Sequence, residues 1–202
     1  MGLPDLTLQL IGFRVLALVI IAGIHGGLVA AAAVLLGDKG PKYDGRVTAA
    51  PTAHVDLVGA FSLVLFGLGW GKPVDVDAGQ LRIGRMGIAG VILAGFVGLL
   101  VTAALFDALV LPALTTLPHT AALTTAAFLR EAGSLSIWFA LLSLIPLPPL
   151  TAGMLLGAIG IRVPRQARWA LAAALVVAVA TGLVQRLLGP AHAWLTAVLV
   201  GG

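Results

Sequence analysis

The stretch 15–38, VLALVIIAGIHGGLVAAAAVLLGD, decides the fold of this chain. From Val15 to Leu36 it carries no charge, and as a helix this part would be ~33 Å long, enough to cross the hydrocarbon core of a bilayer. His25 stands near its middle. A polar ring at that depth needs a hydrogen-bond partner or a ligand, which makes it a candidate functional residue. The stretch therefore predicts a membrane helix with one functional histidine.

The composition extends this prediction to the whole chain. Of its 202 residues, 60% are hydrophobic and 10% are charged, and the mean hydropathy is +1.10. A soluble domain of this length carries a larger charged share. The net charge of +4 is small and dispersed, which is typical of topology-setting loops and predicts no nucleic-acid partner. Cysteine is absent, which excludes disulfides and thiolate chemistry. We expect a single membrane domain, 1–202, in contact with the lipid bilayer.

Four or five spanning helices and one re-entrant segment are expected along the chain. The expected spans include 15–36, 86–111 closed by Pro112, 131–145, and 169–188 broken at Gly189-Pro190. The apolar stretch 57–70 would reach only ~21 Å as a helix, which is too short to cross. Basic residues flank it on both sides, so both of its ends are expected at the cytoplasmic face. Val74 and Val76 alternate with polar residues after it, which predicts a short edge strand there.

Several motifs follow one another in a fixed order. They are His25 with Gly37-Asp38, then His54-Val55-Asp56, the run 69–74 (GWGKPV) and the run 144–150 (LIPLPPL). As an ordered set they resemble the site-2 protease family of intramembrane zinc metalloproteases, in particular its compact bacterial branch. The resemblance covers about 15–157, with additional C-terminal helices over about 168–202. It implies an all-α polytopic membrane protein with a site-2-protease-like helical core, one re-entrant segment and a small β element at the cytoplasmic face. It also implies a multi-pass integral protein of a bacterial inner (cytoplasmic) membrane.

The resemblance also places a catalytic centre, and three of its positions have changed. In the family, two histidines four residues apart and a distant aspartate bind zinc, and a glutamate beside the first histidine is the general base. Here His25 keeps the first position, but Gly26 replaces the base, Val29 the second histidine and Thr151 the aspartate. Catalytic zinc needs three protein ligands, so we expect no catalytic residue and no zinc or other cofactor. His25 is then expected to hydrogen-bond a backbone carbonyl or Thr151.

The functional prediction is a catalytically inactive scaffold or accessory subunit of a larger membrane complex, or a protein that binds transmembrane helices without cleaving them. By the resemblance, its substrate or partner cleft would involve Pro146, Pro148, Pro149 and Leu150. The partners would be other membrane protein subunits. An active but divergent intramembrane zinc metalloprotease is one alternative. A subunit of an energy-transducing complex that binds a haem or chlorophyll-type cofactor through His25 is another. A transporter is disfavoured because no internal repeat is evident.

His54 is a second candidate ligand. No helical spacing brings His25, His54 and Asp56 together, so a joint site is not the main prediction. The pair His54 and Asp56 is interpreted as a hydrogen bond that organises a loop.

Overall fold

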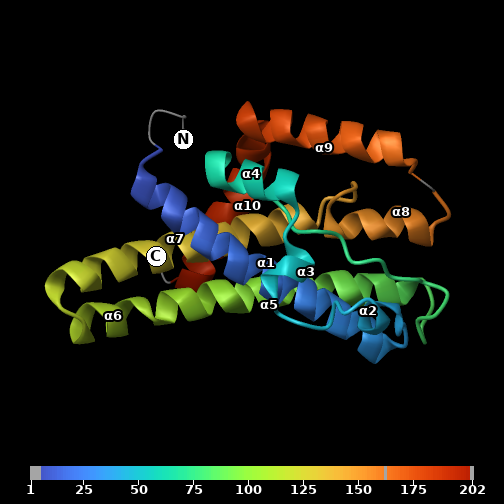
Figure 1. Ribbon diagram of the computed structural model, residues 1–202, viewed down its shortest axis with the longest axis horizontal. Helices are drawn as coiled ribbons and strands as arrows, with labels where there is room; N and C mark the ends of the chain where they lie inside the picture. Colours follow the sequence, from blue (N-terminus) through green and yellow to red (C-terminus); the bar gives the residue numbers. More distant parts are fainter. Residues whose placement is uncertain (1–5, 162, 201–202) are drawn as a thin grey trace.

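The computed structural model describes residues 6–161 and 163–200. Its framework consists of three long helices that pack lengthwise against one another, α1 (Leu8–Leu36), α5 (Met86–Ala108) and α7 (His119–Ser143) (Figure 1). Helix α6 (Val110–Thr116) continues the direction of α5, and α7 returns beside it. The core lies between these helices, where alanine, leucine and phenylalanine side chains are buried.

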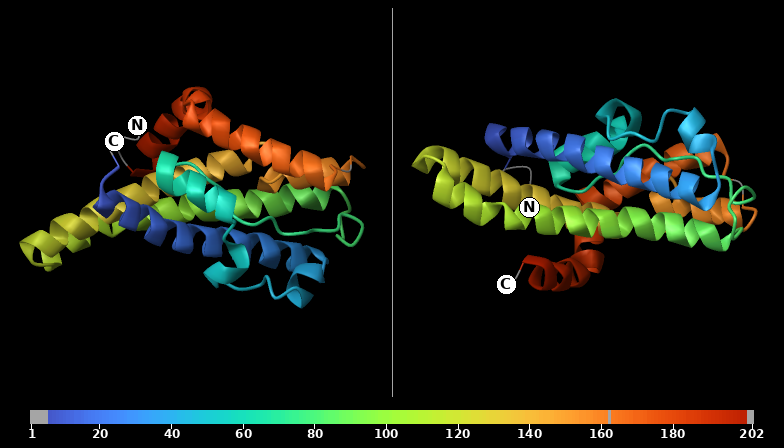
Figure 2. Two further views of the ribbon diagram at one scale, coloured as in Figure 1. Left: turned by 45° about the horizontal axis from the view of Figure 1, so that its top comes forward. Right: turned by 90° about the horizontal axis from the view of Figure 1, so that it is seen from below.

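Shorter elements surround this framework. They are α2 (Gly40–Tyr43), α3 (Pro51–His54), α4 (Leu57–Phe66), the 3-10 turn η2 (Thr151–Gly153), α8 (Met154–Ala158), α9 (Arg165–Ala180) and α10 (Leu183–Val200). Helix α9 lies over α4, and α10 packs on the side of α5 and α7 that faces away from α1 (Figure 2).

The central helix begins and ends at residues with clear local reasons. The hydroxyl of Thr7 accepts a hydrogen bond from the backbone N–H of Leu10, which caps the first turn of α1. Gly37, at φ 122°, ends the helix in a conformation that favours glycine. The uncharged stretch read from the sequence is therefore one continuous helix.

Helix α4 belongs to a segment that reverses direction. Asp56 caps its start by accepting from the N–H of Gly59, and Gly67, at φ 78°, turns the chain back. The returning residues lie directly against α4, since a Cβ on Gly59 would collide with the carbonyl of Trp70. Glycine is required where two backbones approach this closely.

The prediction of a short β element is wrong. Within the described ranges the backbone forms only an isolated bridge, between Val55 and Gly71, and no strand. The segment 72–77 is extended, but no second strand lies beside it to complete a ladder. Side chains hold it instead, as described below.

The number of spanning helices is also lower than predicted. Two helices in the described part of the chain are long and apolar enough to cross a membrane, Leu8–Leu36 and the continuous stretch Met86–Thr116. The pair Arg165–Ala180 and Leu183–Leu199, bent by 70°, would be a third if it acts as one span. Helix α7 does not qualify, because Arg130, Glu131 and several Ser and Thr residues lower its hydropathy.

Two expected breaks lie elsewhere. Pro112 falls in the first turn of α6, where its missing N–H costs no helical hydrogen bond, so the helical direction continues past it. The C-terminal helices break at Thr181-Gly182, where Gly182 has a φ of 76°, and α10 runs through Pro190. The helix therefore ends just before Gly182, which has a positive φ, and not at Gly189-Pro190.

Candidate functional site

His25 lies near the middle of α1 and is almost fully buried. The hydroxyl of Thr151, in η2, lies 2.8 Å from its Nε2. The backbone carbonyl of Gly95, in α5, lies 3.4 Å from its Nδ1. A carbonyl only accepts hydrogen bonds, so Nδ1 carries the proton and Nε2 accepts from Thr151. These two hydrogen bonds thus connect His25 in α1 to Thr151 in η2 and to Gly95 in α5.

The close fit around His25 depends on its neighbours. A Cβ on Gly95 would lie 2.7 Å from the ring carbon Cε1, so α5 must present glycine here. The ring of Phe139, in α7, packs against the imidazole at 62°, with 5.2 Å between the ring centroids. Three helices and one turn therefore fix the orientation of His25.

His54 is the second histidine of this centre. It is fully buried at the end of α3, and its ring lies over Gly26, where a Cβ would overlap Nδ1. Its Nε2 donates to the carbonyl of Thr48 at 2.7 Å. Its Nδ1 has no hydrogen-bond partner among the residues that the structure describes. A buried base with a free lone pair therefore stands beside the helix at Gly26.

Burial lowers the pKa of His54 below its usual value, although the hydrogen bond to the Thr48 carbonyl opposes this shift. The nearby charge of Arg46 adds to the lowering of the pKa. Burial penalises the charged ring, because the surroundings replace little of its hydration. The ring is therefore neutral at neutral pH, consistent with a tautomer that is protonated on Nε2.

The two histidines and Thr151 line one cavity of about 10 Å³. The remaining lining residues are Ala22, Gly26, Val29, Gly71, Lys72 and Val74. This volume is close to the minimum that holds a single water molecule. The interpretation that no spacing brings His25 and His54 together is wrong for these two residues, because tertiary packing places α3 on α1. Gly26 was the available signal, since a glycine inside a helix often marks a close approach.

Asp56 is not part of this cluster. Its carboxylate accepts from the N–H of Gly59 at 2.8 Å, and His54 bonds to Thr48 rather than to Asp56. The predicted hydrogen bond between His54 and Asp56 is therefore wrong. Each residue organises its own local segment instead.

A groove of about 790 Å³ begins at Thr151. One wall is formed by residues 73–79, and the other contains Pro148, Pro149, Leu150 and α8. Pro146, also assigned to the cleft from the sequence, is exposed and does not line it. No hydrogen bond within the described residues involves the backbone N–H of Val74, Asp75 or Val76. The groove therefore has a wall with unused backbone donors.

Two buried charged side chains hold this wall in place. Arg46 Nη2 donates to the carbonyls of Lys72 and Pro73, at 2.8 and 3.1 Å. The carboxylate of Asp38 accepts from the N–H of Asp77 at 2.8 Å and from the N–H of Gly40 at 2.8 Å. The segment is thus fixed at both ends while its middle remains free to pair.

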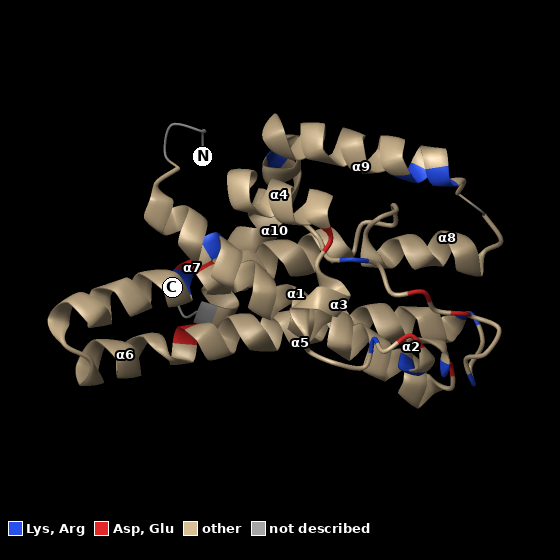
Figure 3. Ribbon diagram, in the orientation of Figure 1, with Lys and Arg blue, Asp and Glu red and all other residues tan. Residues whose placement is uncertain are grey.

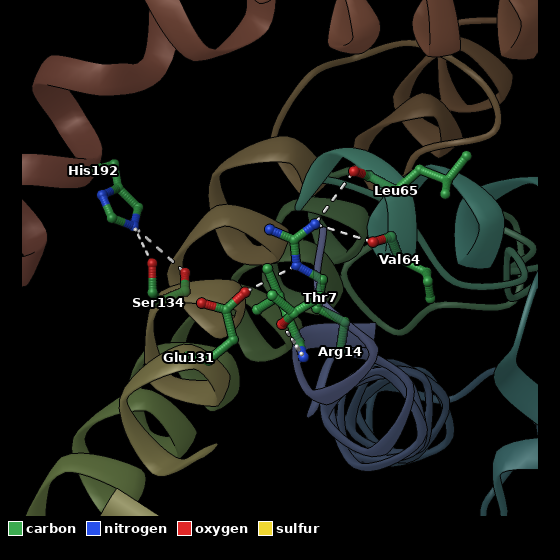
Figure 4. Close-up of polar contacts among 8 residues, drawn as sticks. Thr7, Arg14, Val64, Leu65, Glu131, Ser134 and His192 are labelled. Carbon is green, nitrogen blue, oxygen red and sulfur yellow. Dashed lines mark hydrogen bonds and ion pairs between the residues drawn. The ribbon is translucent and has the colours of Figure 1, made fainter. Parts of the chain in front are cut away.

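A separate, partly buried ion pair lies at the last turn of α4 (Figure 4). Arg14 Nε lies 3.0 Å from Glu131 Oε1, and Arg14 Nη1 donates to the carbonyls of Val64 and Leu65 at 3.0 and 3.3 Å. These carbonyls belong to the last turn of α4, where helical partners are missing. No spacing in the sequence indicated this contact, which joins residues 117 positions apart in the chain.

The fold and this centre define a helical membrane protein with a buried histidine centre at the inner end of a groove. A protein of Bacillus subtilis (strain 168) named "Putative zinc metalloprotease YwhC" is 31% identical to the chain over 146 residues, which are 71% of this chain and 67% of that protein. The chain therefore belongs to the site-2 protease family, as a distant relative of that protein. No protein-family model matches the chain. No solved structure matches it either.

Proposed function

We propose that this protein is a catalytically inactive member of the site-2 protease family. In this proposal it acts in a bacterial inner membrane as an accessory or scaffold subunit that binds a segment of a partner membrane protein without cleaving it. The observation that carries the proposal is the hydrogen bond from Thr151 to His25 Nε2 at 2.8 Å. It occupies the lone pair with which this histidine would bind a metal.

The residues at the centre do not suit the catalytic zinc of the family. Such a zinc ion is held by three protein ligands and a water molecule. Val29 offers no donor atom, and within the described residues no group of three or more His, Cys, Asp or Glu side chains could hold a metal. Gly26 stands where a general base would be, and the ring of His54 fills the adjoining space. Water activation by the family's mechanism therefore has neither its metal site nor its base.

A binding role is supported by the groove. An extended peptide laid along 74–76 would receive backbone hydrogen bonds from a wall that is already held in place by Arg46 and Asp38. Addition of a strand to an exposed edge is a common mode of peptide recognition, in which main-chain bonds provide affinity. We propose that the partner segment occupies this groove in extended form.

Zinc analysis of the purified full chain tests the loss of the metal site. We expect far less than one zinc per chain and no cleavage of a transmembrane substrate. The double variant Val29→His/Thr151→Asp restores three ligands on the faces that line the cavity and should retain about one zinc per chain. Leu28→His/Thr151→Asp is the matched control, since Leu28 does not line the cavity, and should retain none. Stoichiometric zinc in the unaltered chain, lost in His25→Ala, would overturn the proposal.

A photo-cross-linking residue at Leu156, which lines the groove, tests partner binding in native membranes. We expect a cross-linked membrane protein whose yield falls in Val76→Pro, because proline removes a backbone donor. Val76→Ala keeps that donor and should retain the cross-link. Equal yields for the two variants would contradict strand addition. A visible absorption band that is lost in His25→Ala would instead favour the cofactor-binding alternative.

A further inference from the structure

A second cavity, of about 290 Å³, lies near the start of α1 and is separate from the histidine centre. Its polar lining comes from Arg14, Glu131, Ser134 and Gln185. Its apolar lining includes Phe66, Leu68 and Trp138. A water molecule takes about 30 Å³ of liquid volume, so this cavity holds more than a few waters and approaches the size of small-ligand sites.

The position of this cavity along α1 indicates its depth in a bilayer. From Arg14 to Leu36 the helix rises ~33 Å, close to the ~30 Å thickness of the hydrocarbon core. Charged residues gather at the end of the molecule where α2, the loop before α5 and the start of α9 lie, and a smaller group lies near the start of α1 (Figure 3). If the larger group marks one surface of the core, Arg14 lies at the other surface.

Contacts between aromatic rings place parts of α5 and α7 beside the Arg14 end of α1. Phe128 packs edge-to-face on both Phe13 and Phe106. Charged residues lie within three positions of these rings on each helix, Arg14 on α1, Asp107 on α5 and Glu131 on α7. The polar end of the cavity, at Arg14 and Glu131, thus lies where phospholipid headgroups begin.

Two acceptors at the cavity wall have no donor within the described residues. Glu131 uses Oε1 for Arg14, and no hydrogen bond reaches its Oε2. Gln185 donates from Nε2 to the carbonyl of Val179 at 3.1 Å, which fixes the orientation of its amide. The amide oxygen of Gln185 is buried and has no partner there. A ligand that complements this wall must therefore supply N–H or O–H donors.

We propose that this cavity binds a phospholipid headgroup that carries hydrogen-bond donors, an ammonium or a hydroxyl group. The donors face Glu131 and Gln185, and the first methylene groups of the lipid lie against Phe66 and Leu68. Headgroups with such donors are present at this depth, whereas a lipid with a quaternary ammonium group offers none. The proposal does not depend on the function proposed above, because it concerns a different cavity.

Native mass spectrometry of the detergent-solubilised full chain tests this proposal. The chain is titrated separately with phosphatidylethanolamine, phosphatidylglycerol and phosphatidylcholine of identical acyl chains. We expect one molecule of at least one of the first two lipids to bind about tenfold more tightly than phosphatidylcholine, the effect of about one hydrogen bond to a charged or buried acceptor. Preference for phosphatidylethanolamine alone would assign an ammonium headgroup, and preference for phosphatidylglycerol alone a hydroxyl headgroup.

Three variants make the test specific. Gln185→Leu removes one acceptor, and Glu131→Gln keeps an oxygen for Arg14 while replacing the second acceptor by a donor. Both should reduce or abolish the preference over phosphatidylcholine. Gln166→Leu makes the same chemical change on an exposed face of α9, outside the cavity, and should leave the preference intact. Equal binding of the three lipids by the unaltered chain, or a preference that survives both cavity variants, would overturn the proposal.

Discussion

At the scale of single residues, the packing of the histidine centre depends on the absence of a side chain at Gly26. The ring of His54 lies in the volume that any side chain at this position would occupy. A glutamate at 26, as in the family's catalytic motif, would therefore displace His54 from its bond with Thr48. The glycine at position 26 and the buried ring of His54 therefore belong to the same packing arrangement.

Gly26→Ala is expected to lower the free energy of unfolding by about 1–3 kcal/mol, because the added methyl group overpacks against His54. Gly12→Ala is the matched control in the same helix, since nothing lies within 4 Å of its added Cβ. It should stabilise α1 by roughly 0.5–1 kcal/mol through helix propensity. Unfolding measured in mild detergent provides the comparison. If overpacking is the cause, Gly26→Ala should cost much less in a His54→Ala background, and an unchanged cost there would reject the explanation.

His54 should also make stability depend on pH. Its pKa is lowered by burial, so between the folded pKa and about 6.5 the unfolded chain binds more protons than the folded chain. Stability from this residue is thus fully present above about pH 6.5 and is lost as the pH falls toward the folded pKa. We expect the unfolding midpoint to decrease between pH 7 and pH 5, and the decrease to be smaller in His54→Gln. A steeper decrease in the variant would show that the sign is wrong.

At the scale of elements, Arg14 explains how α4 ends inside the molecule. The last carbonyls of a helix lack intrahelical partners, and a cation near them is favourable. Arg14 supplies donors to two of these carbonyls and pairs with Glu131 on α7. One side chain therefore joins α1, α4 and α7.

Replacing Arg14 should loosen this junction. Arg14→Met leaves Glu131 and the α4 carbonyls without these donors, and because Glu131 is only partly buried this should cost about 1–3 kcal/mol. Arg14→Lys keeps the charge but not the planar fork, so an intermediate loss is expected. Hydrogen exchange should report faster opening of α4 in both variants, and a smaller increase in the exchange rate at α5. Unaltered exchange at α4 would mean that packing against α1 and α9, without the Arg14 hydrogen bonds, is enough to hold this helix.

At the scale of the whole molecule, the distribution of charge predicts the topology. Basic residues of α2, the loop before α5 and the start of α9 lie toward one end, and the turn between α6 and α7 lies toward the other (Figure 3). Positively charged loops face the cytoplasm. The hairpin of α6 and α7 is therefore expected on the opposite side.

The absence of cysteine from the sequence makes this topology directly testable. Lys42→Cys and Arg168→Cys should react with a membrane-impermeant maleimide only from the cytoplasmic side. Thr120→Cys, in the first turn of α7, should react only from the other side. All three positions are exposed, so burial does not limit labelling. Labelling of Thr120→Cys from the same side as Lys42→Cys would invert the placement of the hairpin.

The family and the membrane character of the chain were predictable from the sequence. Both rest on local information: ordered motifs, and apolar runs such as 15–36 long enough to cross a bilayer. The helices predicted over 15–36 and 86–111 are confirmed as long apolar helices, although α5 ends at Ala108 and α6 continues its direction. The assignment of Gly26, Val29 and Thr151 to the family's catalytic positions came from the resemblance and stays a prediction.

Contacts between distant segments were decided only by the tertiary structure. Helical periodicity relates residues within one element, so it could not place His54 on Gly26 or Arg14 beside Glu131. Alternation at Val74 and Val76 indicated an extended segment, but a strand also needs a pairing partner, and none of the described segments forms a ladder with it. Sequence by itself determined which segments are helical and apolar. Packing determined which polar groups meet, because burial makes each of them take the partner that the fold brings within reach.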